Sequence, residues 1–381
     1  MRQGFFSKLF TRSLHKTFFA WQIEITTRCP LACRMCIRHG RSDWVAADMS
    51  LHDFEKLIPY FHDVETIILQ GWGEPLLHKD LGAIIRAAKS ATKNGSGPSR
   101  HAGVESPAVG FVTSGKGLDD RMSAELMDAG VDFIGFSFAG STAKTHEAIR
   151  LNSDFRELIH AVAAFNELKQ KRGLTGLRTH IVYVMLRDNL NDIPALPRLA
   201  RDIGIQEIFL TNLIQVTNGW QDEQRTFTCE DRNDMLEVLS AAGEEAGKKG
   251  VRLRCSALSP SSVAVCEENP LKNLYISAGG EVSPCVYLHP PTSPRFTKIY
   301  CGQEYESERV SFGNVFQEPF NRIWNGVEYS LFREPLAQRA RQSPGMLSPF
   351  WLFGNNQEEG IIASYPDPPS ACRLCHKMLG V

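Results

Sequence analysis

The chain has 381 residues, of which 43% are hydrophobic and 22% are charged, and its formal net charge is −1. This composition is typical of a globular enzyme with one large domain and one smaller one. The near-zero charge argues against a broad nucleic-acid-binding surface. No apolar run approaches the roughly 20 residues that span a bilayer. We therefore expect a cytoplasmic protein with no nucleic-acid partner.

Residues 1–20 are basic and apolar, with four basic residues, no acidic residue and interleaved phenylalanines and leucines. The basic residues interrupt any continuous apolar core, so the segment makes a poor secretory signal. A basic amphipathic helix lying on a membrane is one interpretation. We favour packing across the bottom of a barrel, because helices with one apolar face usually pack against protein.

From residue 21 to about residue 213, short β-rich runs alternate with helical patterns. Strands are predicted at 21–26, 66–69, 109–113, 133–137, 179–184 and 207–211. Helices are predicted near 51–61, 79–92, 119–129, 143–171 and 192–203. This alternation indicates right-handed βαβ units and a parallel sheet, either a partial barrel or an open doubly wound sheet. Both folds place the site at the carboxyl ends of the strands.

The chain divides by composition into four parts. The N-terminal segment covers 1–20, the barrel 21–228, a linking helix 229–254 and a cysteine-rich domain 255–381. Within the barrel, residues 94–110 are rich in Gly, Ser and Pro and predict a flexible insertion.

Three of the ten cysteines follow the first predicted strand, as Cys29-x3-Cys33-x2-Cys36. Three thiolates on one loop can hold three irons of a [4Fe–4S] cluster and leave the fourth iron open to a ligand. A structural zinc site is the alternative, but zinc usually takes four ligands, often from two CxxC pairs. Clustered cysteines in such a chain indicate metal ligands.

This CxxxCxxC motif resembles that of the radical S-adenosylmethionine (SAM) superfamily. The resemblance implies that SAM binds the open iron and is reductively cleaved to a 5′-deoxyadenosyl radical, chemistry that the cofactor carries. It also implies an electron donor of the ferredoxin or flavodoxin type. Met35 stands where the family often has an aromatic residue, so we expect altered packing around the adenine.

A second segment, Gln70 to Pro75, reads QGWGEP and resembles the family's GGEP motif, with Trp72 in place of a glycine. The resemblance implies that backbone carbonyls of Gly71, Trp72 and Gly73, together with the Glu74 carboxylate, bind the SAM amino group. Glycine permits such a close backbone approach.

Two further segments follow the third and fourth predicted strands. Thr113 and Ser114 resemble part of the family's TNG motif, which lies near the ribose and methionyl groups. Ser137 and Arg150 resemble residues near the SAM carboxylate, which suits a guanidinium fork. Ala139 replaces an aspartate of that pattern, and for Ser137 and Arg150 an ordinary strand end and helix remain the alternative.

The C-terminal region carries Cys266-x13-Gly280-x4-Cys285 and a later pair, Cys372-x2-Cys375. With the stretch 312–333, this pattern resembles SPASM/Twitch extensions of radical SAM enzymes. Gly280 fits a hairpin turn that brings the first two cysteines together.

Four cysteines support one auxiliary [4Fe–4S] cluster, with a Cys₄ zinc site as the alternative. Cys255 or Cys301 could substitute as a ligand, whereas Cys229 is expected to be structural.

The fold class expected is therefore α/β, a partial (β/α)6 TIM-like barrel followed by a small α+β auxiliary-cluster domain. Aromatic and proline-rich insertions at 287–311 and 341–371 favour oxidative maturation of a peptide, protein or cofactor precursor. Dehydrogenation of a small-molecule alcohol, such as an aminocyclitol, is the second hypothesis, and a non-catalytic zinc-binding adaptor is the third.

No catalytic acid or base is predicted from the sequence. Polar or soft residues at strand ends could face the pocket: Tyr183, Met185, Asn189, Thr211 and Asn212.

Overall fold

The computed structural model describes residues 16–91, 106–227, 233–300, 302–342 and 365–381. The prediction for the N-terminal segment falls almost entirely outside these residues. So do the roles suggested for Cys229 and Cys301, most of the insertion at 94–110 and most of the insertion at 341–371.

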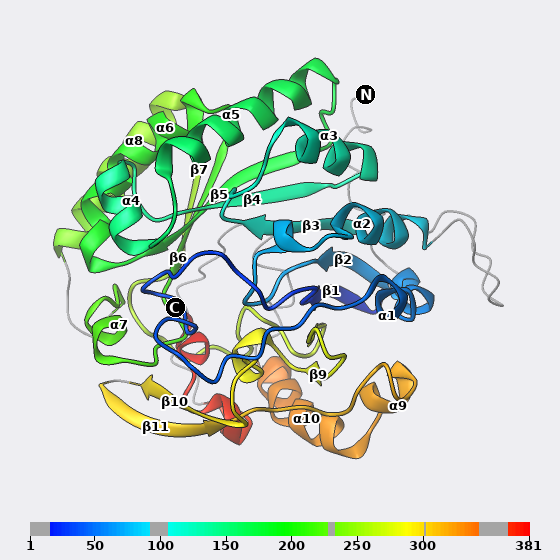
Figure 1. Cartoon of the computed structure of the whole chain (residues 1–381). Coiled ribbons are helices and arrows are strands. Elements are labelled where there is room, and N and C mark those ends of the chain that lie inside the picture. Colours follow the sequence, from blue (N-terminus) through cyan, green and yellow to red (C-terminus); the bar gives the residue numbers. More distant parts are fainter. Residues whose placement is uncertain (1–15, 92–105, 228–232, 301, 343–364) are drawn as a thin grey trace, which may run out of the picture.

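One nine-stranded sheet organises the molecule, in the order β7-β6-β5-β4-β3-β2-β1-β8-β9 (Figure 1). Strands β1 to β8 are parallel to their neighbours, and β9 is antiparallel to β8. The strands are β1 (Phe18–Ile23), β2 (Val64–Ile68), β3 (Ala108–Thr113), β4 (Phe133–Phe138), β5 (Arg178–Met185), β6 (Glu207–Asn212), β7 (Arg252–Cys255), β8 (Asn273–Ile276) and β9 (Val282–Ser283). The six predicted strands are thus confirmed, and the partial barrel gains strands at both edges.

Strand β1 begins three residues earlier than predicted, because its aromatic side chains have partners that the pattern did not reveal. Phe18 and Trp21 pack on Phe320 of the C-terminal half, with ring centroids 5.7 and 4.6 Å apart. Trp21 is fully buried. The chain leaves the ladder after Ile23 and enters the cysteine loop.

Helices follow the strands and cover the outer face of the sheet (Figure 1). The α-helices before β7 are α1 (Leu51–Glu55), α2 (Leu81–Ser90), α3 (Asp120–Ala129), α4 (Ala143–Ile149), α5 (Phe155–Lys171), α6 (Leu196–Asp202), α7 (Gly219–Glu223) and α8 (Asn233–Lys249). Short 3-10 helices are η1 (Ile58–Asp63), η2 (Pro75–Leu77) and η3 (Arg187–Ala195). Their apolar faces and the outward strand residues form one continuous core.

The helix predicted over 143–171 is two helices in the structure. Helix α4 ends at Arg150, whose backbone is no longer helical (φ −98°, ψ 76°), and Asn152 has a positive φ of 68°. Asp154 then starts α5 by accepting a hydrogen bond from the Glu157 N–H, a typical N-cap. The break brings Arg150 to the edge of the site described below.

Helix α8 and strand β7 extend the barrel beyond the six predicted strands. Helix α8 packs against η3 and α6, and β7 pairs with β6. The segment expected as a linking helix therefore forms the helix of a further βαβ unit. The proposed domain boundaries stay a prediction.

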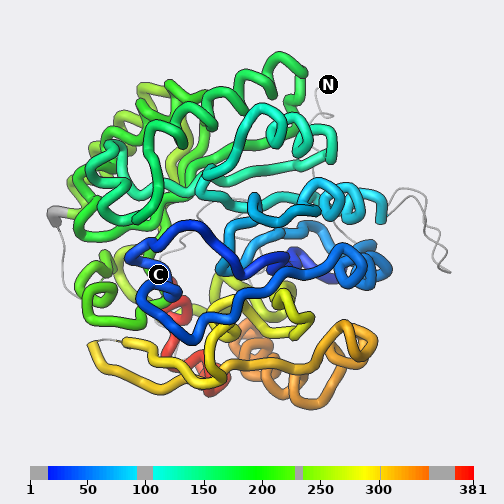
Figure 2. Tube along the Cα trace, in the orientation of Figure 1, coloured from blue at the N-terminus to red at the C-terminus, as the bar shows by residue number. Residues whose placement is uncertain are grey.

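The C-terminal half adds β8 and β9 to the sheet next to β1, followed by a hairpin and two helices. These elements are η4 (Val286–Leu288), β10 (Arg295–Tyr300), β11 (Gln303–Glu308), α9 (Phe320–Trp324), α10 (Val327–Gln342), η5 (Ser370–Cys372) and η6 (His376–Leu379). Residues 365–381, red in Figure 2, return toward the barrel, where His376 bonds to the Ile214 carbonyl (3.2 Å). This return closes the C-terminal half on the carboxyl side of β6.

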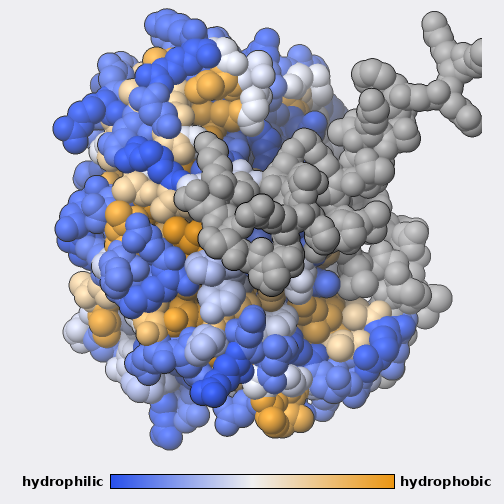
Figure 3. Space-filling view, turned by 90° about the vertical axis from the view of Figure 1, so that its right-hand side faces the viewer, coloured by the Kyte–Doolittle hydropathy of each residue, from blue (hydrophilic) through white to orange (hydrophobic). Residues whose placement is uncertain are grey.

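Hydrophilic residues surround smaller hydrophobic areas on the face shown in Figure 3. In the part of the chain that the structure describes, no helix combines the length and apolar character needed to cross a bilayer.

Candidate functional site

The loop between β1 and α1 carries the first three cysteines. Backbone bonds from Thr27 N–H to the Ala47 carbonyl (2.9 Å) and from Met49 N–H to the Ile25 carbonyl (2.8 Å) close its base. Two more, from Ala32 N–H to the Leu151 carbonyl and from Arg34 N–H to the Ile149 carbonyl, tie its tip to the end of α4. The loop is therefore held against the barrel at both ends.

The three thiols pack in one apolar cluster with Leu31 and Met35. Cys33 is 8% exposed, and Cys29 and Cys36 are half-buried. Helix α7 holds the third cysteine, because Gln221 Nε2 donates to the Cys36 carbonyl at 3.3 Å. The structure thus brings the three predicted ligands of the first cluster together.

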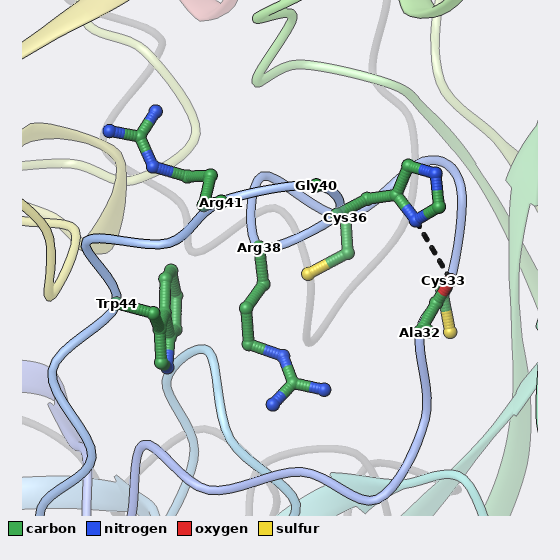
Figure 4. Close-up of a pocket in the computed structure, with 8 residues that line it drawn as sticks. Ala32, Cys33, Cys36, Arg38, Gly40, Arg41 and Trp44 are labelled. Carbon is green, nitrogen blue, oxygen red and sulfur yellow. Dashed lines mark hydrogen bonds between the residues drawn. The ribbon is translucent and has the colours of Figure 1, made fainter.

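A cavity of about 180 Å³ lies beside Cys33 and Cys36 (Figure 4). The remaining lining residues are Ala32, Arg38, His39, Gly40, Arg41 and Trp44. The His39 ring lines the cavity and bonds to the Ala32 carbonyl at 3.1 Å. Space for a bound group therefore adjoins two of the thiols.

The thiols sit in a poorly solvated environment. Burial raises the pKa of Cys36 to about 12 and also raises the pKa of Cys29. A metal ligand must be a thiolate, so metal binding here releases protons. Three thiols form a soft donor set of the kind that selects iron–sulfur clusters or zinc. Among the described residues, no three His, Cys, Asp or Glu side chains converge on a position for one metal ion.

Glu74 joins the ends of β2 and β3. Its carboxylate is 3% exposed and accepts hydrogen bonds from Thr113 Oγ1 (2.6 Å), Ser114 N–H (2.7 Å), Ser114 Oγ (2.7 Å) and Leu76 N–H (3.2 Å). Three predicted SAM contacts are therefore in mutual contact. Because four donors of the protein itself bond to Glu74, its carboxylate stabilises the conformation of the loop after β2 even without a ligand.

The two glycines of the Gly71–Glu74 segment lie where no side chain fits. A Cβ on Gly73 would lie 2.1 Å from the Thr26 carbonyl oxygen, and one on Gly71 would lie 2.2 Å from Glu24 Oε1. The Glu74 N–H donates to the Arg28 carbonyl at 2.7 Å, next to Cys29. The segment thus lies directly on the cysteine loop, as the sequence predicts.

Trp72 projects from this segment toward the C-terminal half. Its ring packs edge-on against Tyr287, with centroids 6.1 Å apart. Tyr287 in turn packs against a cluster that contains the four C-terminal cysteines Cys266, Cys285, Cys372 and Cys375. Trp72, which replaces the family's glycine, therefore links the Gly71–Glu74 segment to the C-terminal half by one ring contact.

Arg150 lies beside the cysteine loop and is 8% exposed. Its Nη1 is 3.9 Å from Cys33 Sγ, and its buried Nε has no hydrogen-bond partner among the described residues. A buried guanidinium N–H without a partner is costly, so this position fits an anionic ligand such as a carboxylate. Ser137 is half-buried at the end of β4.

The second group of cysteines lies in one cluster with Leu288 and Met378, in which Cys375 is half-buried and the other three are buried. It consists of Cys266, Cys285, Cys372 and Cys375. Burial, and then the proximity of Glu268 and of other thiols in the group, raise the pKa values of its first two members well above the ordinary range. The four predicted auxiliary ligands therefore share one cluster, although their side chains do not surround a single metal position. Cys255 packs instead near Met185 in the main core, at 3.8 Å between the sulfur atoms.

The polar residues at the ends of β5 and β6 mostly form hydrogen bonds with backbone groups of the protein. Tyr183 Oη donates to the Asn189 carbonyl (2.8 Å), and Asn189 Oδ1 accepts from the Leu186 N–H (2.8 Å). Asn212 donates to the Ala257 carbonyl at 2.8 Å. These residues shape the barrel mouth, and Thr211 is half-buried there.

Glu24 is a residue at the site that the sequence reasoning missed. It is fully buried and accepts hydrogen bonds from the Trp72 N–H (2.6 Å) and from Tyr275 Oη (2.6 Å). Burial raises its pKa to about 7. A lone carboxylate within the apolar run WQIEI was the available signal, because buried charged residues are rare without a partner.

Comparison with known proteins identifies two family domains in the chain. The family model of the radical SAM superfamily matches residues 23–200, and that of the SPASM iron–sulfur cluster-binding domain matches residues 266–346. Among curated proteins, the chain is 26% identical to the tungsten-containing aldehyde ferredoxin oxidoreductase cofactor-modifying protein of Pyrococcus furiosus, covering 82% of each chain. It is 24% identical to the pre-heme d1 synthase of Dinoroseobacter shibae, covering 87% of this chain and 78% of that protein.

A PqqA peptide cyclase of Granulibacter bethesdensis is 25% identical over 59% of this chain and 54% of its own. Among solved structures, Streptococcus suis SuiB bound to S-adenosylmethionine superposes with a TM-score of 0.58 at 15% identity, covering 84% of this chain and 68% of SuiB. This last likeness is one of fold. The chain belongs to the radical SAM superfamily and is an enzyme of that superfamily, with a C-terminal SPASM-type domain and the iron–sulfur clusters and SAM that these domains bind.

Proposed function

We propose that this enzyme matures a peptide, protein or cofactor precursor by abstracting a hydrogen atom from it. The supporting observation is that three cysteines, the Gly71–Glu74 segment and Arg150, whose Nε has no partner among the described residues, lie together at one end of the sheet. When bound, the cluster and SAM supply the one-electron chemistry of the superfamily. The protein positions these groups and the substrate.

Each predicted site residue has a proposed role consistent with its contacts. Cys29, Cys33 and Cys36 hold the SAM-binding cluster. Arg150 pairs with the SAM carboxylate, since its Nε lacks a partner in the described chain. Backbone carbonyls of the Gly71–Glu74 segment accept from the SAM amino group, and Glu74, bonded to Thr113 and Ser114, keeps that segment in shape. Ser137 contributes a hydroxyl near the same pocket.

The four cysteines of the C-terminal half would hold the auxiliary cluster. Four thiols leave no iron open to substrate, and such a closed cluster suits one-electron transfer. This favours an oxidative outcome for the substrate. A ferredoxin or flavodoxin would deliver the electron that starts the reaction.

The names of the relatives support the substrate class. They are a cofactor-modifying protein, a pre-heme synthase and a peptide cyclase. Our proposal for this chain is therefore a peptide or cofactor precursor. Dehydrogenation of a small alcohol, such as an aminocyclitol, remains the competing outcome of the substrate assay.

The test begins with iron and sulfide counts after anaerobic reconstitution. We expect about eight irons in the wild type and about four in the Cys29→Ala/Cys33→Ala/Cys36→Ala variant, as cysteine ligation of two [4Fe–4S] clusters requires. Cys255→Ala is the matched control and keeps all the iron, because this cysteine packs in the main core. Zinc in place of iron would overturn the proposal.

The same samples then receive SAM and dithionite. We expect 5′-deoxyadenosine from the wild type and the control, and none from the triple variant. With deuterated candidates, transfer of deuterium from a peptide or cofactor precursor supports the substrate class. Transfer from a sugar carbon, and from no peptide or cofactor precursor, would favour the alcohol dehydrogenase hypothesis.

A further inference from the structure

Glu24 lies between the Gly71–Glu74 segment and the first hairpin of the C-terminal half. One carboxylate oxygen accepts the Trp72 N–H and the other accepts the Tyr275 hydroxyl, each at 2.6 Å. The Ala278 backbone N–H lies near enough to this carboxylate to lower its pKa. The side chain is fully buried, so it does not contact bulk solvent.

The bond to Trp72 determines the orientation of one peptide group. The Trp72 N–H and the Gly71 carbonyl belong to the same planar trans peptide, in which the two groups point in opposite directions. Because the N–H points at Glu24, the Gly71 carbonyl points to the opposite side of the segment. No backbone N–H among the described residues donates to that carbonyl oxygen, so it is available to a ligand.

The Glu24 side chain occupies the space in which a side chain at position 71 would lie. The three heavy atoms nearest to a Cβ built on Gly71 all belong to the Glu24 side chain, at 2.2 to 2.5 Å. Glycine at position 71 therefore lets the carboxylate approach close enough to bond the next N–H.

The other side of Glu24 is tied to the C-terminal half. Tyr275 is fully buried in β8, which pairs with β1. His289 lies near this tyrosine, with ring centroids 6.2 Å apart, and pairs with Glu281 at 2.8 Å. Cys285 lies between these two residues in the sequence. One carboxylate thus connects the Gly71–Glu74 segment to the region that carries the auxiliary cysteines.

We infer that Glu24 is a positioning residue: it directs the Gly71 carbonyl into the SAM site and fixes that site relative to the C-terminal hairpin. The inference rests on the proposed function, because it assumes that SAM binds at this segment. It assigns Glu24 no contact with SAM.

The test compares Glu24→Gln with Glu24→Met in anaerobically reconstituted enzyme. Glutamine keeps an oxygen that accepts the Trp72 N–H, whereas methionine has a similar length and no such acceptor. We expect Glu24→Met to weaken SAM binding about tenfold or more in equilibrium dialysis, the factor that 1.4 kcal/mol would produce. Glu24→Gln should stay within about threefold of the wild type. Both variants should keep the wild-type iron content, because neither removes a cysteine.

Wild-type affinity in a folded Glu24→Met enzyme would overturn the inference, as would equal losses in both variants. If Glu24→Met fails to fold, Tyr275→Phe replaces it, since it removes one hydroxyl and leaves the Trp72 bond in place. A loss of SAM affinity with unchanged iron in Tyr275→Phe supports the coupling, and an unchanged affinity refutes it. If the wild type itself binds no iron or SAM, the proposed function fails instead.

Discussion

Replacing Glu74 by glutamine tests the network that joins β2 to β3. The carboxylate accepts four hydrogen bonds, two of them from backbone N–H groups, of Ser114 and Leu76. Glutamine presents one oxygen and one NH₂ group in the same space. The hydroxyls of Thr113 and Ser114 can rotate and accept from the amide, but a backbone N–H cannot.

The expected loss of stability follows from the number of backbone N–H groups that glutamine leaves without an acceptor. If the amide nitrogen takes the position of Oε2, the Ser114 N–H loses its acceptor. If it takes the position of Oε1, the Leu76 N–H loses its acceptor. Glu74 is 3% exposed, so water does not replace the missing partner. A buried donor left without a partner costs about 1–3 kcal/mol, and we expect the free energy of unfolding to fall by that amount.

Urea unfolding of the anaerobic enzyme measures this change, with Glu237→Gln, at an exposed position on α8, as the matched control. The control should stay within about 0.5 kcal/mol of the wild type, as surface substitutions usually do. The Glu74 variant should also bind SAM more weakly, because the distorted segment carries the predicted contacts. A stability within the control's range would refute the argument that Glu74 supports this loop.

Three further predictions follow from the same site. Gly73→Ala places a Cβ 2.1 Å from the Thr26 carbonyl oxygen, so we expect the free energy of unfolding in urea to fall by about 1–3 kcal/mol. Gly176→Ala is the control and should lose no stability, because the space around Gly176 is open. Equal stabilities of the two variants would contradict the steric argument. Burial raises the pKa of Glu24 from 4.5 to about 7, so the folded protein holds this proton more tightly than the unfolded chain does. The resulting stabilisation is complete below pH 4.5 and is lost as the pH rises to 7. The stability of the wild type relative to Glu24→Gln should therefore fall by about 3 kcal/mol between these pH values, and a flat difference would refute the shift. Arg150→Met should weaken SAM binding about tenfold or more without loss of iron, since hydrogen bonds to charged groups contribute roughly 1.5–3 kcal/mol; unchanged affinity in dialysis would remove Arg150 from the site.

The alternation of strands and helices was readable because it depends on local periodicity. Each strand of the barrel is a short apolar run followed by a helical pattern, and the structure confirms all six predicted strands. The helix predicted over 143–171 was wrong at its middle, where a cap at Asp154 starts a second helix. A capping residue inside an apolar periodic pattern is easily missed, since the pattern continues on both sides of the break.

The cysteine motifs were also readable, because their ligands lie within a few residues of one another or on either side of a turn. The residues that contact each cysteine or each site carboxylate could not be predicted from the sequence. The bond between Arg150 and Cys33 joins residues 117 positions apart, and that between Tyr275 and Glu24 joins residues 251 apart. Such contacts depend on which strands become neighbours.

The sequence by itself determined the superfamily resemblance, the parallel α/β barrel and the two groups of cysteines, because motif spacing and hydrophobic periodicity are local properties of the chain. The tertiary structure alone decided that β8 pairs with β1, that Glu74 bonds to Thr113 and Ser114, and that Glu24 lies under Gly71. The physical reason is that a buried carboxylate needs donors from whatever segments the fold brings to it, and those donors come from strands distant in sequence.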